Sequence, residues 1–204
     1  MIAIIDYGAG NIQSVSKALK HIGCECFITN KREEILSADG AVLPGVGSFG
    51  DTVDSMNKFG IKETVREFIK SGKPFLGICL GLQLLFLTSE ESEGAEGLDI
   101  FGGKIKKIPA AEGLKIPHMG WNSLNIKKKC RLFEGIEENP YVYFVHSYYL
   151  DADDKSIVAA QTEYGVTIDA AIESGNVFAT QFHPEKSGET GLKILKNFAD
   201  IVEG

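Results

Sequence analysis

The sequence has 204 residues, a usual length for one domain, and 44% of them are hydrophobic, enough to build a core. Its 21 basic and 28 acidic residues give a formal net charge of −7, which argues against binding to nucleic acid or to a membrane surface. No run approaches the roughly 20 apolar residues of a membrane span, and residues 1–6 lack the basic flank of a signal peptide. We therefore expect one cytoplasmic domain over residues 1–204.

The first half of the chain alternates short β-type runs with amphipathic helical patterns. The runs that predict strands cover residues 1–6, 24–29, 40–44 and 74–78. Apolar residues at helical spacing predict helices over 12–22, around 61–72 and over 80–88. This alternation predicts an α/β fold with an open, mostly parallel, doubly wound sheet and helices on both faces.

The second half changes character after residues 89–97, which are rich in Glu, Ser and Gly and predict a surface loop. The β-type runs that follow cover residues 104–108, 120–126, 141–150, 157–162, 167–173 and 177–182. Because residues 174–176 form a turn signal, we expect the last two runs to make an antiparallel hairpin. Apolar residues at helical spacing over 191–202 predict a closing helix.

The four cysteines show neither a disulfide framework nor the Cys-x-x-Cys pairs of a structural zinc site. We expect reduced thiols, and we assign Cys24, Cys26 and Cys130 the ordinary role of small buried hydrophobic residues.

Cys79 differs because it lies in the sequence Gly-Ile-Cys-Leu-Gly at residues 77–81, between a predicted strand and a predicted helix. A Gly-x-nucleophile-x-Gly turn needs small neighbours because its backbone is tight and strained. The start of the following helix can stabilise a thiolate and supply N–H groups for an oxyanion. The motif also suits a peptidase or a redox protein.

A cysteine nucleophile needs a base, and His183 is the strongest candidate of four histidines. It follows the apolar run 177–182 and precedes Pro184 and Glu185. An isolated His-Pro-Glu is usually a solvated strand end, but with a cysteine turn at another strand end it predicts a Cys-His-Glu triad. We expect His118 and His146 to be structural and hydrogen-bonded near the site, not metal ligands.

Residues 45–50, Gly-Val-Gly-Ser-Phe-Gly, formally match the Gly-x-Gly-x-x-Gly pattern of dinucleotide binding. The pattern normally occupies the first strand-to-helix turn, whereas this is the third turn, and Gln13 breaks the match at Gly8-Ala9-Gly10. A glycine loop can also bring backbone N–H groups to a substrate oxygen, which suits an oxyanion hole opposite Cys79.

Taken together, residues 77–83 and 181–185 resemble the nucleophile and His-Glu segments of the class I (triad) glutamine amidotransferases. Three further segments, residues 6–11, 117–122 and 143–148, resemble the glutaminase subunits of imidazole glycerol phosphate synthases. The resemblance runs in the expected order from residue 6 to residue 187.

The resemblance implies a flavodoxin-like fold and the hydrolysis of L-glutamine to glutamate and ammonia, with no cofactor and no metal. It implies that Cys79 attacks the amide, that His183 carries the proton and that Glu185 orients His183. The remaining site residues that it implies are the backbone of Gly45, Val46, Gly47 and Leu80 as the oxyanion hole, and Gln83, Ser147 and Tyr148 as glutamine-binding groups.

The same resemblance implies a heterodimer with a (β/α)8-barrel cyclase subunit that uses the ammonia in histidine biosynthesis. Because an unpaired glutaminase would waste glutamine, we also expect weak glutaminase activity without that partner. Asn11, Trp121 and Lys186 are expected to face the cyclase and line the ammonia exit. Three alternatives stay open: a paralogous amidotransferase for sugar amidination in surface-polysaccharide synthesis, a cysteine peptidase or redox sensor, and a nucleotide-binding module that uses residues 45–50.

Overall fold

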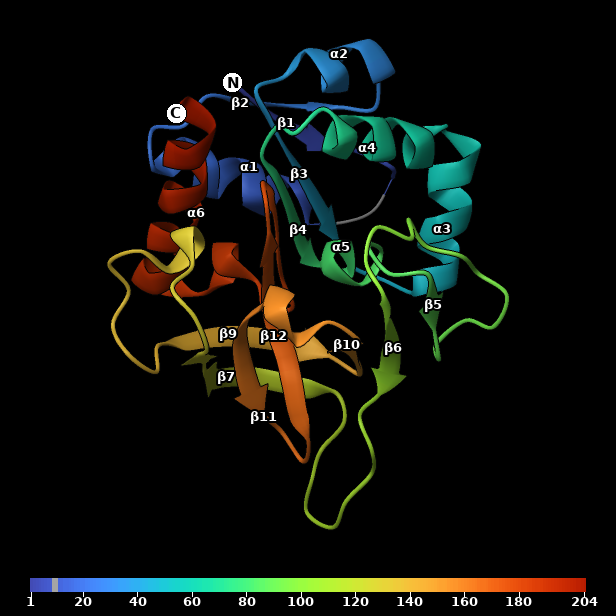
Figure 1. Cartoon of the computed structure of the whole chain (residues 1–204), viewed down its shortest axis with the longest axis vertical. Helices are drawn as coiled ribbons and strands as arrows, with labels where there is room; N and C mark the ends of the chain where they lie inside the picture. The colour runs from blue at the N-terminus through green and yellow to red at the C-terminus, as the bar shows by residue number, and fades with distance from the viewer. Residues whose placement is uncertain (9–10) are drawn as a thin grey trace.

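The computed structural model describes residues 1–8 and 11–204, and Figure 1 shows their arrangement. Its largest sheet has the strand order β2-β1-β3-β4-β13-β12-β11-β8. The parallel part of this sheet consists of β2 (Cys26–Thr29), β1 (Ile2–Ile5), β3 (Gly40–Gly45), β4 (Phe75–Cys79) and β13 (Val177–Thr180). The antiparallel part consists of β12 (Thr167–Ser174), β11 (Val158–Glu163) and β8 (Asn125–Ile126).

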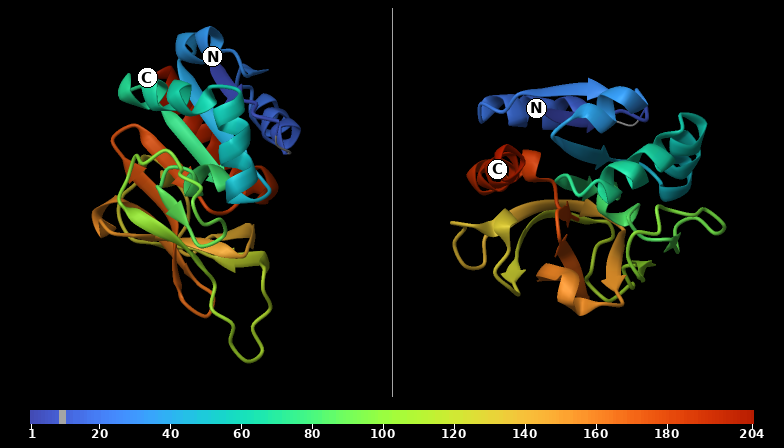
Figure 2. Two further views of the ribbon diagram at one scale, coloured as in Figure 1. Left: turned by 90° about the vertical axis from the view of Figure 1, so that its right-hand side faces the viewer. Right: turned by 45° about the horizontal axis from the view of Figure 1, so that its top comes forward.

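Helices cover both faces of the parallel strands, as Figure 2 shows from two further directions. One face packs against α1 (Ile12–His21) and α6 (Gly188–Glu203), and the other against α2 (Arg32–Ser37), α3 (Phe49–Lys58) and α4 (Ile61–Lys70). Successive residues of a strand point to opposite faces. In β1, Ile2 and Ile4 therefore pack on the side of α1 and α6, and Ala3 and Ile5 pack on the side of α2, α3 and α4. The predicted fold class is confirmed.

A β-rich part lies below the parallel strands in Figure 1, and the two termini lie close together at the opposite end. It contains a three-stranded sheet of β10 (Tyr148–Ala152), β6 (Gly103–Lys107) and β5 (Thr88–Ser89), and an antiparallel pair of β7 (His118–Ser123) and β9 (Tyr141–His146). Short helices complete the chain: α5 (Leu80–Gln83), η1 (Arg131–Phe133), η2 (Lys155–Ile157) and η3 (Pro184–Lys186).

The predicted helix over residues 80–88 is too long, because α5 ends at Gln83. The carbonyl of Leu84 accepts from the N–H of Leu98 at 2.7 Å, and that of Leu85 accepts from the N–H of Ile100 at 2.8 Å. A longer helix would use these carbonyls internally. Hydrogen bonds to a later segment therefore end the helix, and local spacing does not report them.

Two predicted β-type runs are each divided between sheets. Residues 141–150 form β9 and β10, which separate at Ser147, and residues 120–126 form β7 and β8, which separate at Leu124. The alternation of side chains continues across each break, so the sequence shows one run. The predicted hairpin of β12 and β13 is confirmed, and so is the closing helix, which begins at Gly188.

Two helices were not predicted, namely α2 and α3. The side chain of Ser48 caps α3 by accepting from the N–H of Asp51 at 3.3 Å. Ser48 was interpreted as part of the glycine loop, which concealed its capping signal. Among the helices of the described residues, none combines the length and the apolar character needed to cross a membrane.

Candidate active site

Cys79 is the last residue of β4 and pairs in register with Gly45 of β3. Its backbone has φ 55° and ψ −104°, a strained conformation for a residue with a side chain. The flanking glycines are required by close packing. A Cβ at Gly81 would lie 2.0 Å from the Leu43 carbonyl oxygen, and one at Gly77 would lie 2.6 Å from the Gly81 oxygen. These contacts present the cysteine at the carboxyl end of the sheet.

The helix after Cys79 is shorter than the sequence predicts, so its dipole is weaker. With four residues, α5 has little macrodipole to stabilise a thiolate. What remains is the local geometry, in which the backbone of Leu80 and its neighbours follows Cys79 directly.

His183 reaches this point because β13 lies beside β4 and runs parallel to it, with Thr180 opposite Ile78. Its main chain is tied on both sides: its N–H donates to the Tyr143 carbonyl at 3.0 Å, and its carbonyl accepts from Ser187 Oγ at 2.7 Å. The imidazole is thereby fixed at the same edge as Cys79.

Glu185 orients that imidazole. Its Oε1 lies 2.7 Å from His183 Nδ1, and both side chains are 0% exposed. Burial lowers the pKa of His183, but the neighbouring Cys79 and Glu185 outweigh burial and raise it to about 9. The Nε2 atom has no hydrogen-bond partner within residues 1–8 and 11–204. It is the ring atom available for the Cys79 proton.

The three residues assigned to the partner face lie on the elements that surround this turn. The side-chain amide of Asn11 donates to Glu185 Oε1 and lies 3.5 Å from His183 Nδ1. Lys186 is exposed on η3 itself. Trp121 is 56% exposed and makes an edge contact with Tyr143, whose carbonyl anchors His183. Ala9 and Gly10, part of the segment that carried the resemblance, lie outside the described residues.

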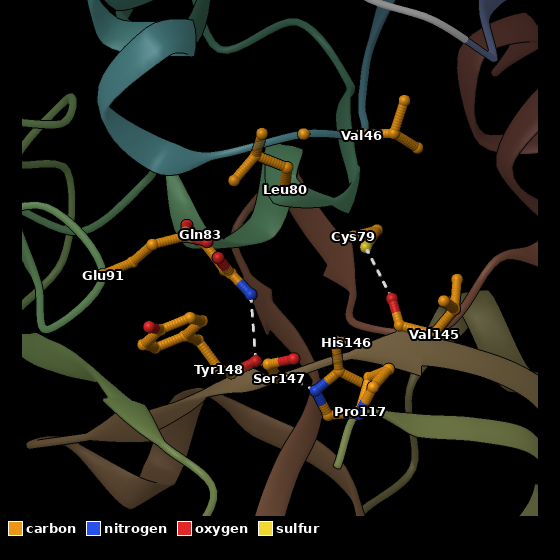
Figure 3. Close-up of a pocket in the computed structure, with 11 residues that line it drawn as sticks. Val46, Cys79, Leu80, Gln83, Glu91, Pro117, Val145, His146, Ser147 and Tyr148 are labelled. Atoms are coloured by element: carbon orange, nitrogen blue, oxygen red, sulfur yellow. Dashed lines mark hydrogen bonds between the residues drawn. The ribbon is translucent and has the colours of Figure 1, made fainter.

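A cavity of about 330 Å³ opens beside Cys79, and Figure 3 shows the side chains around it. Besides Cys79, its lining includes all three predicted glutamine-binding residues, Gln83, Ser147 and Tyr148, and three of the four predicted oxyanion residues, Val46, Gly47 and Leu80. Gly45 lies behind the lining, where a Cβ would be 2.5 Å from the Tyr7 hydroxyl and 2.8 Å from Leu80 Cβ.

Four lining residues were not predicted as site residues: Glu91, Pro117, Val145 and His146. Glu91 Oε2 accepts from the Phe49 N–H at 2.7 Å, which brings the predicted surface loop 89–97 against the start of α3. No local pattern marks Glu91, because this contact joins residues 42 apart. Pro117, Val145 and His146 lie in segments that carried the resemblance, which was the available signal.

His118 and His146 form a buried pair, with His118 Nδ1 3.0 Å from His146 Nε2. Burial lowers the pKa of His118 to about 4 and that of His146 to about 3, so both rings are neutral near pH 7. No cluster of three or more His, Cys, Asp or Glu side chains in the described chain is suited to hold a metal ion.

This arrangement suits acyl transfer through a thioester. A sulfur lies beside an imidazole with one free nitrogen, a buried carboxylate orients the ring, and backbone segments at Leu80 and at residues 46–47 border the same cavity. The structure therefore brings together side chains that are about a hundred residues apart in the sequence.

Comparison with known proteins gives a consistent relationship. A family model described as "Glutamine amidotransferase class-I" matches residues 3–202. The imidazole glycerol phosphate synthase subunit HisH of Caldanaerobacter subterraneus subsp. tengcongensis is 53% identical, covering 100% of this chain and 99% of the relative. The subunit of the same name from Methanothermobacter thermautotrophicus is 51% identical, covering 99% of both chains.

Solved structures agree on the fold. The structure of PurLQS from Thermotoga maritima superposes with a TM-score of 0.77 at 21% identity, covering 98% of this chain and 97% of that chain. At this identity the likeness concerns the fold alone, and it matches the doubly wound sheet described above.

Proposed function

The chain belongs to the class-I glutamine amidotransferase family, and we propose that it is the glutaminase subunit of an imidazole glycerol phosphate synthase. It is an enzyme that hydrolyses L-glutamine to glutamate and ammonia, and the ammonia serves histidine biosynthesis. Two relatives that are half identical over their whole length carry the name of this synthase, which favours it over sugar amidination.

The observation that carries the catalytic assignment is the convergence of Cys79, His183 and Glu185 at the carboxyl ends of two adjacent parallel strands. The pKa of His183, raised to about 9 by the neighbouring Cys79 and Glu185, means that the imidazole holds a proton near neutral pH. A thiolate is the nucleophilic form of cysteine, and a protonated imidazole beside the sulfur favours that form.

In the proposed mechanism the Cys79 thiolate forms a bond to the side-chain amide carbon of glutamine, and the carbonyl electrons move onto oxygen. The tetrahedral intermediate collapses, the carbon–nitrogen bond breaks, and His183 gives its proton to the departing ammonia. His183 then takes a proton from water, whose oxygen attacks the thioester carbon. Glutamate leaves, and the thiolate is restored.

The lining of the cavity supports roles for the remaining predicted residues. The N–H of Leu80 and an N–H of Val46 or Gly47 stabilise the oxyanion, with Gly45 providing the close packing behind them. Gln83 directs its Nε2 atom to the Tyr148 carbonyl at 3.0 Å and to Gln181 Oε1 at 3.1 Å, which leaves Gln83 Oε1 for the substrate (Figure 3). Ser147 and Tyr148 complete the glutamine site.

Ammonia passes to a cyclase partner built as a (β/α)8 barrel, in a heterodimer. The position of Asn11, Trp121 and Lys186 around the His183–Glu185 turn supports an exit at this face. A cytoplasmic location is part of the proposal and is supported by four unpaired cysteines, which suit a reducing compartment. The single-domain organisation over residues 1–204 stays a prediction.

The decisive test uses Cys79→Ala with the candidate cyclase and its ribonucleotide substrate. We expect glutamine hydrolysis to fall by at least about a thousandfold, because the nucleophile is gone. The complex should still use free ammonia at close to the wild-type rate. Ammonia and glutamate are measured with and without the cyclase, and stimulation by the cyclase is expected.

Cys26→Ala serves as the control, since Cys26 is a half-buried thiol far from the cavity lining. If Cys79→Ala hydrolysed glutamine as fast as Cys26→Ala, the triad assignment would be wrong.

A further inference from the structure

The side chain of Gln181 is fully buried beside the nucleophile and has no part in the mechanism above. It follows β13, and its backbone N–H continues the sheet by donating to the Ala170 carbonyl at 2.8 Å. Because Thr180 pairs with Ile78, the next residues along, Gln181 and Cys79, are neighbours across the sheet. The Nε2 atom of Gln181 lies 3.7 Å from Cys79 Sγ.

The orientation of this amide follows from one backbone carbonyl. The Tyr148 carbonyl can only accept, so the Gln83 atom 3.0 Å from it must be the nitrogen Nε2. That nitrogen also lies 3.1 Å from Gln181, so the facing Gln181 atom must be the acceptor Oε1. The Gln181 nitrogen is then the atom that faces the sulfur, and it faces it as a donor.

Two hydrogen-bonded histidines hold the same Tyr148 carbonyl in place. His146 Nδ1 lies 2.9 Å from the Tyr148 oxygen and must donate to it, which leaves His146 Nε2 as an acceptor for His118 Nδ1. His118 Nε2 is then the acceptor for the Asn122 amide at 3.3 Å. In this series of hydrogen bonds, each nitrogen can act only as the donor or only as the acceptor. The Tyr148 carbonyl that orients Gln83 and Gln181 is therefore itself fixed.

We propose that Gln181 is a further catalytic residue, whose amide N–H donates to the Cys79 sulfur and holds it as a thiolate beside His183. The inference rests on the proposed role of Cys79 as the nucleophile. A hydrogen bond to an ionised acceptor is stronger than one between neutral groups, and burial strengthens it further. With α5 only four residues long, this amide compensates for a weak helix dipole.

The test removes the donor while keeping the shape. Gln181→Met is compared with wild type in the pH profile of Cys79 alkylation by iodoacetamide, followed at Cys79 by peptide mass spectrometry. We expect the profile to move to higher pH by about one unit and the rate near neutral pH to fall about tenfold, because less of the sulfur is ionised. The pH profile of glutamine hydrolysis, measured with the cyclase, should move to higher pH by a similar amount.

Thr180→Val is the matched control, because Thr180 is equally buried and its hydroxyl donates to the Phe182 carbonyl at 3.0 Å without touching the sulfur. It should destabilise the same strand end and leave the alkylation profile in place. If Gln181→Met gives the wild-type profile, or if Thr180→Val moves the profile as far, the inference is overturned.

If Gln181→Met does not fold, Gln181→Glu provides the second test. A carboxylate has the same shape as the amide but repels a thiolate, so the pH profile of Cys79 alkylation must move to higher pH. A wild-type profile for Gln181→Glu contradicts the inference. Failure of the proposed function would look different: wild-type protein fully alkylated at Cys79 would still hydrolyse glutamine.

Discussion

Cys79 adopts a φ of 55°, and a residue with a side chain is held there only if its surroundings impose it. Strain of this kind costs roughly 1–3 kcal/mol. The constraint comes from both neighbouring strands, since Gly45 of β3 lies in register with Cys79 and Thr180 of β13 pairs with the preceding Ile78. The strain and the placement of the sulfur beside the cavity at the end of the sheet therefore have one origin, the close packing of glycine backbones.

The neutral histidine pair makes the protein sensitive to acid. His118 and His146 have pKa values lowered by burial, to about 4 and about 3, from the ordinary 6.5. Between pH 6.5 and these lowered pKa values, the unfolded chain binds protons that the folded protein does not bind. The free energy of unfolding therefore falls as the pH drops from 6.5 toward 4. Each histidine contributes a slope of roughly 1.4 kcal/mol per pH unit within that interval.

Replacing His118 tests this expectation. His118 stacks between Phe144 and Tyr164, so His118→Phe keeps the packing and removes one titrating ring. The free energy of unfolding, measured in urea at several pH values, should depend less steeply on pH in this variant. Between pH 6.5 and about 4 the slope should be smaller by roughly 1.4 kcal/mol per pH unit. His21→Phe, at the exposed end of α1, is the control. Equal slopes in wild type and His118→Phe would contradict the prediction.

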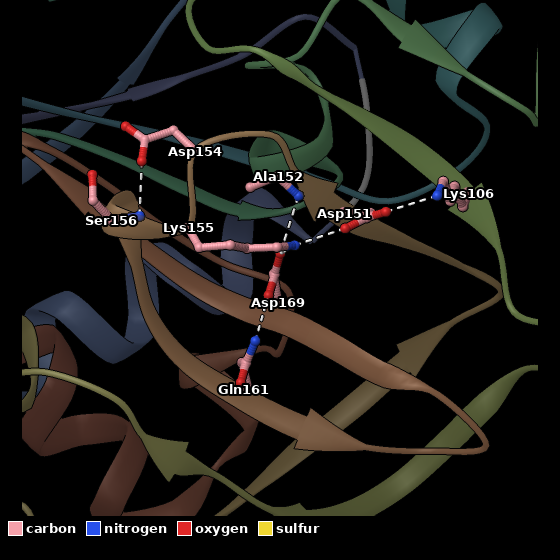
Figure 4. Close-up of polar contacts among 8 residues, drawn as sticks. All are labelled: Lys106, Asp151, Ala152, Asp154, Lys155, Ser156, Gln161 and Asp169. Atoms are coloured by element: carbon pink, nitrogen blue, oxygen red, sulfur yellow. Dashed lines mark hydrogen bonds and ion pairs between the residues drawn. The ribbon is translucent and has the colours of Figure 1, made fainter.

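At the scale of elements, β10 carries Tyr148 into the cavity and is anchored to the large sheet by a buried carboxylate. Figure 4 shows this network around Asp169 of β12, whose side chain is 2% exposed. Asp169 Oδ2 accepts from the Ala152 N–H at 3.0 Å and from Lys155 Nζ at 2.8 Å, and Oδ1 accepts from Gln161 Nε2 at 2.8 Å. One carboxylate thus joins β10, β11, β12 and η2.

Asp169→Leu should destabilise the protein by about 2–4 kcal/mol, because it leaves the buried Ala152 N–H and the Gln161 amide without their acceptor, whereas Lys155 keeps its ion pair with Asp151. Thermal and urea unfolding measure the change. The control is Asp151→Asn on the same strand, whose ion pairs with Lys106 and Lys155 are partly exposed and worth up to about 1 kcal/mol. Similar losses in both variants would show that Asp169 is not the anchor.

At the scale of the whole molecule, the β7–β9 pair separates two faces. His118 and Phe144 lie on the buried face, whereas Met119, Trp121 and Tyr141 lie on the other and are 62%, 56% and 62% exposed. An exposed apolar group of this size indicates a docking surface. Its position beside the turn that holds His183 fits the proposed cyclase partner, which would cover the ammonia exit.

Trp121→Ala should weaken association with the cyclase by about 2 kcal/mol, roughly thirtyfold in Kd, because a large exposed ring is a typical anchor of an interface. Calorimetric titration of the cyclase measures the effect, and thermal unfolding of the free subunit should change little. Phe59→Ala is a matched control, since Phe59 is 48% exposed at the end of α3. A wild-type Kd for Trp121→Ala would remove this residue from the interface.

The sequence determined the parallel sheet and its nucleophile turn, because both follow from local patterns. Alternating strands and helices specified the doubly wound fold, and the glycines around Cys79 and the Pro184–Glu185 pair after His183 marked two strand ends. That these ends adjoin is a consequence of strand order, in which β13 returns from the end of the chain to lie beside β4. The proposed triad could be read from the sequence because its members lie at the ends of recognisable strands.

Tertiary structure alone decided what depends on contacts between distant segments. The end of α5 is fixed by hydrogen bonds from Leu98 and Ile100, the break at Ser147 by the assignment of β9 and β10 to different sheets, and the place of Glu91 by its bond to Phe49. Gln181 was visible only as part of a motif, and its contact with the sulfur depends on the register of β13 with β4. Local propensity specifies which segments form strands and helices, whereas the partners of buried polar groups are set only when the chain has packed.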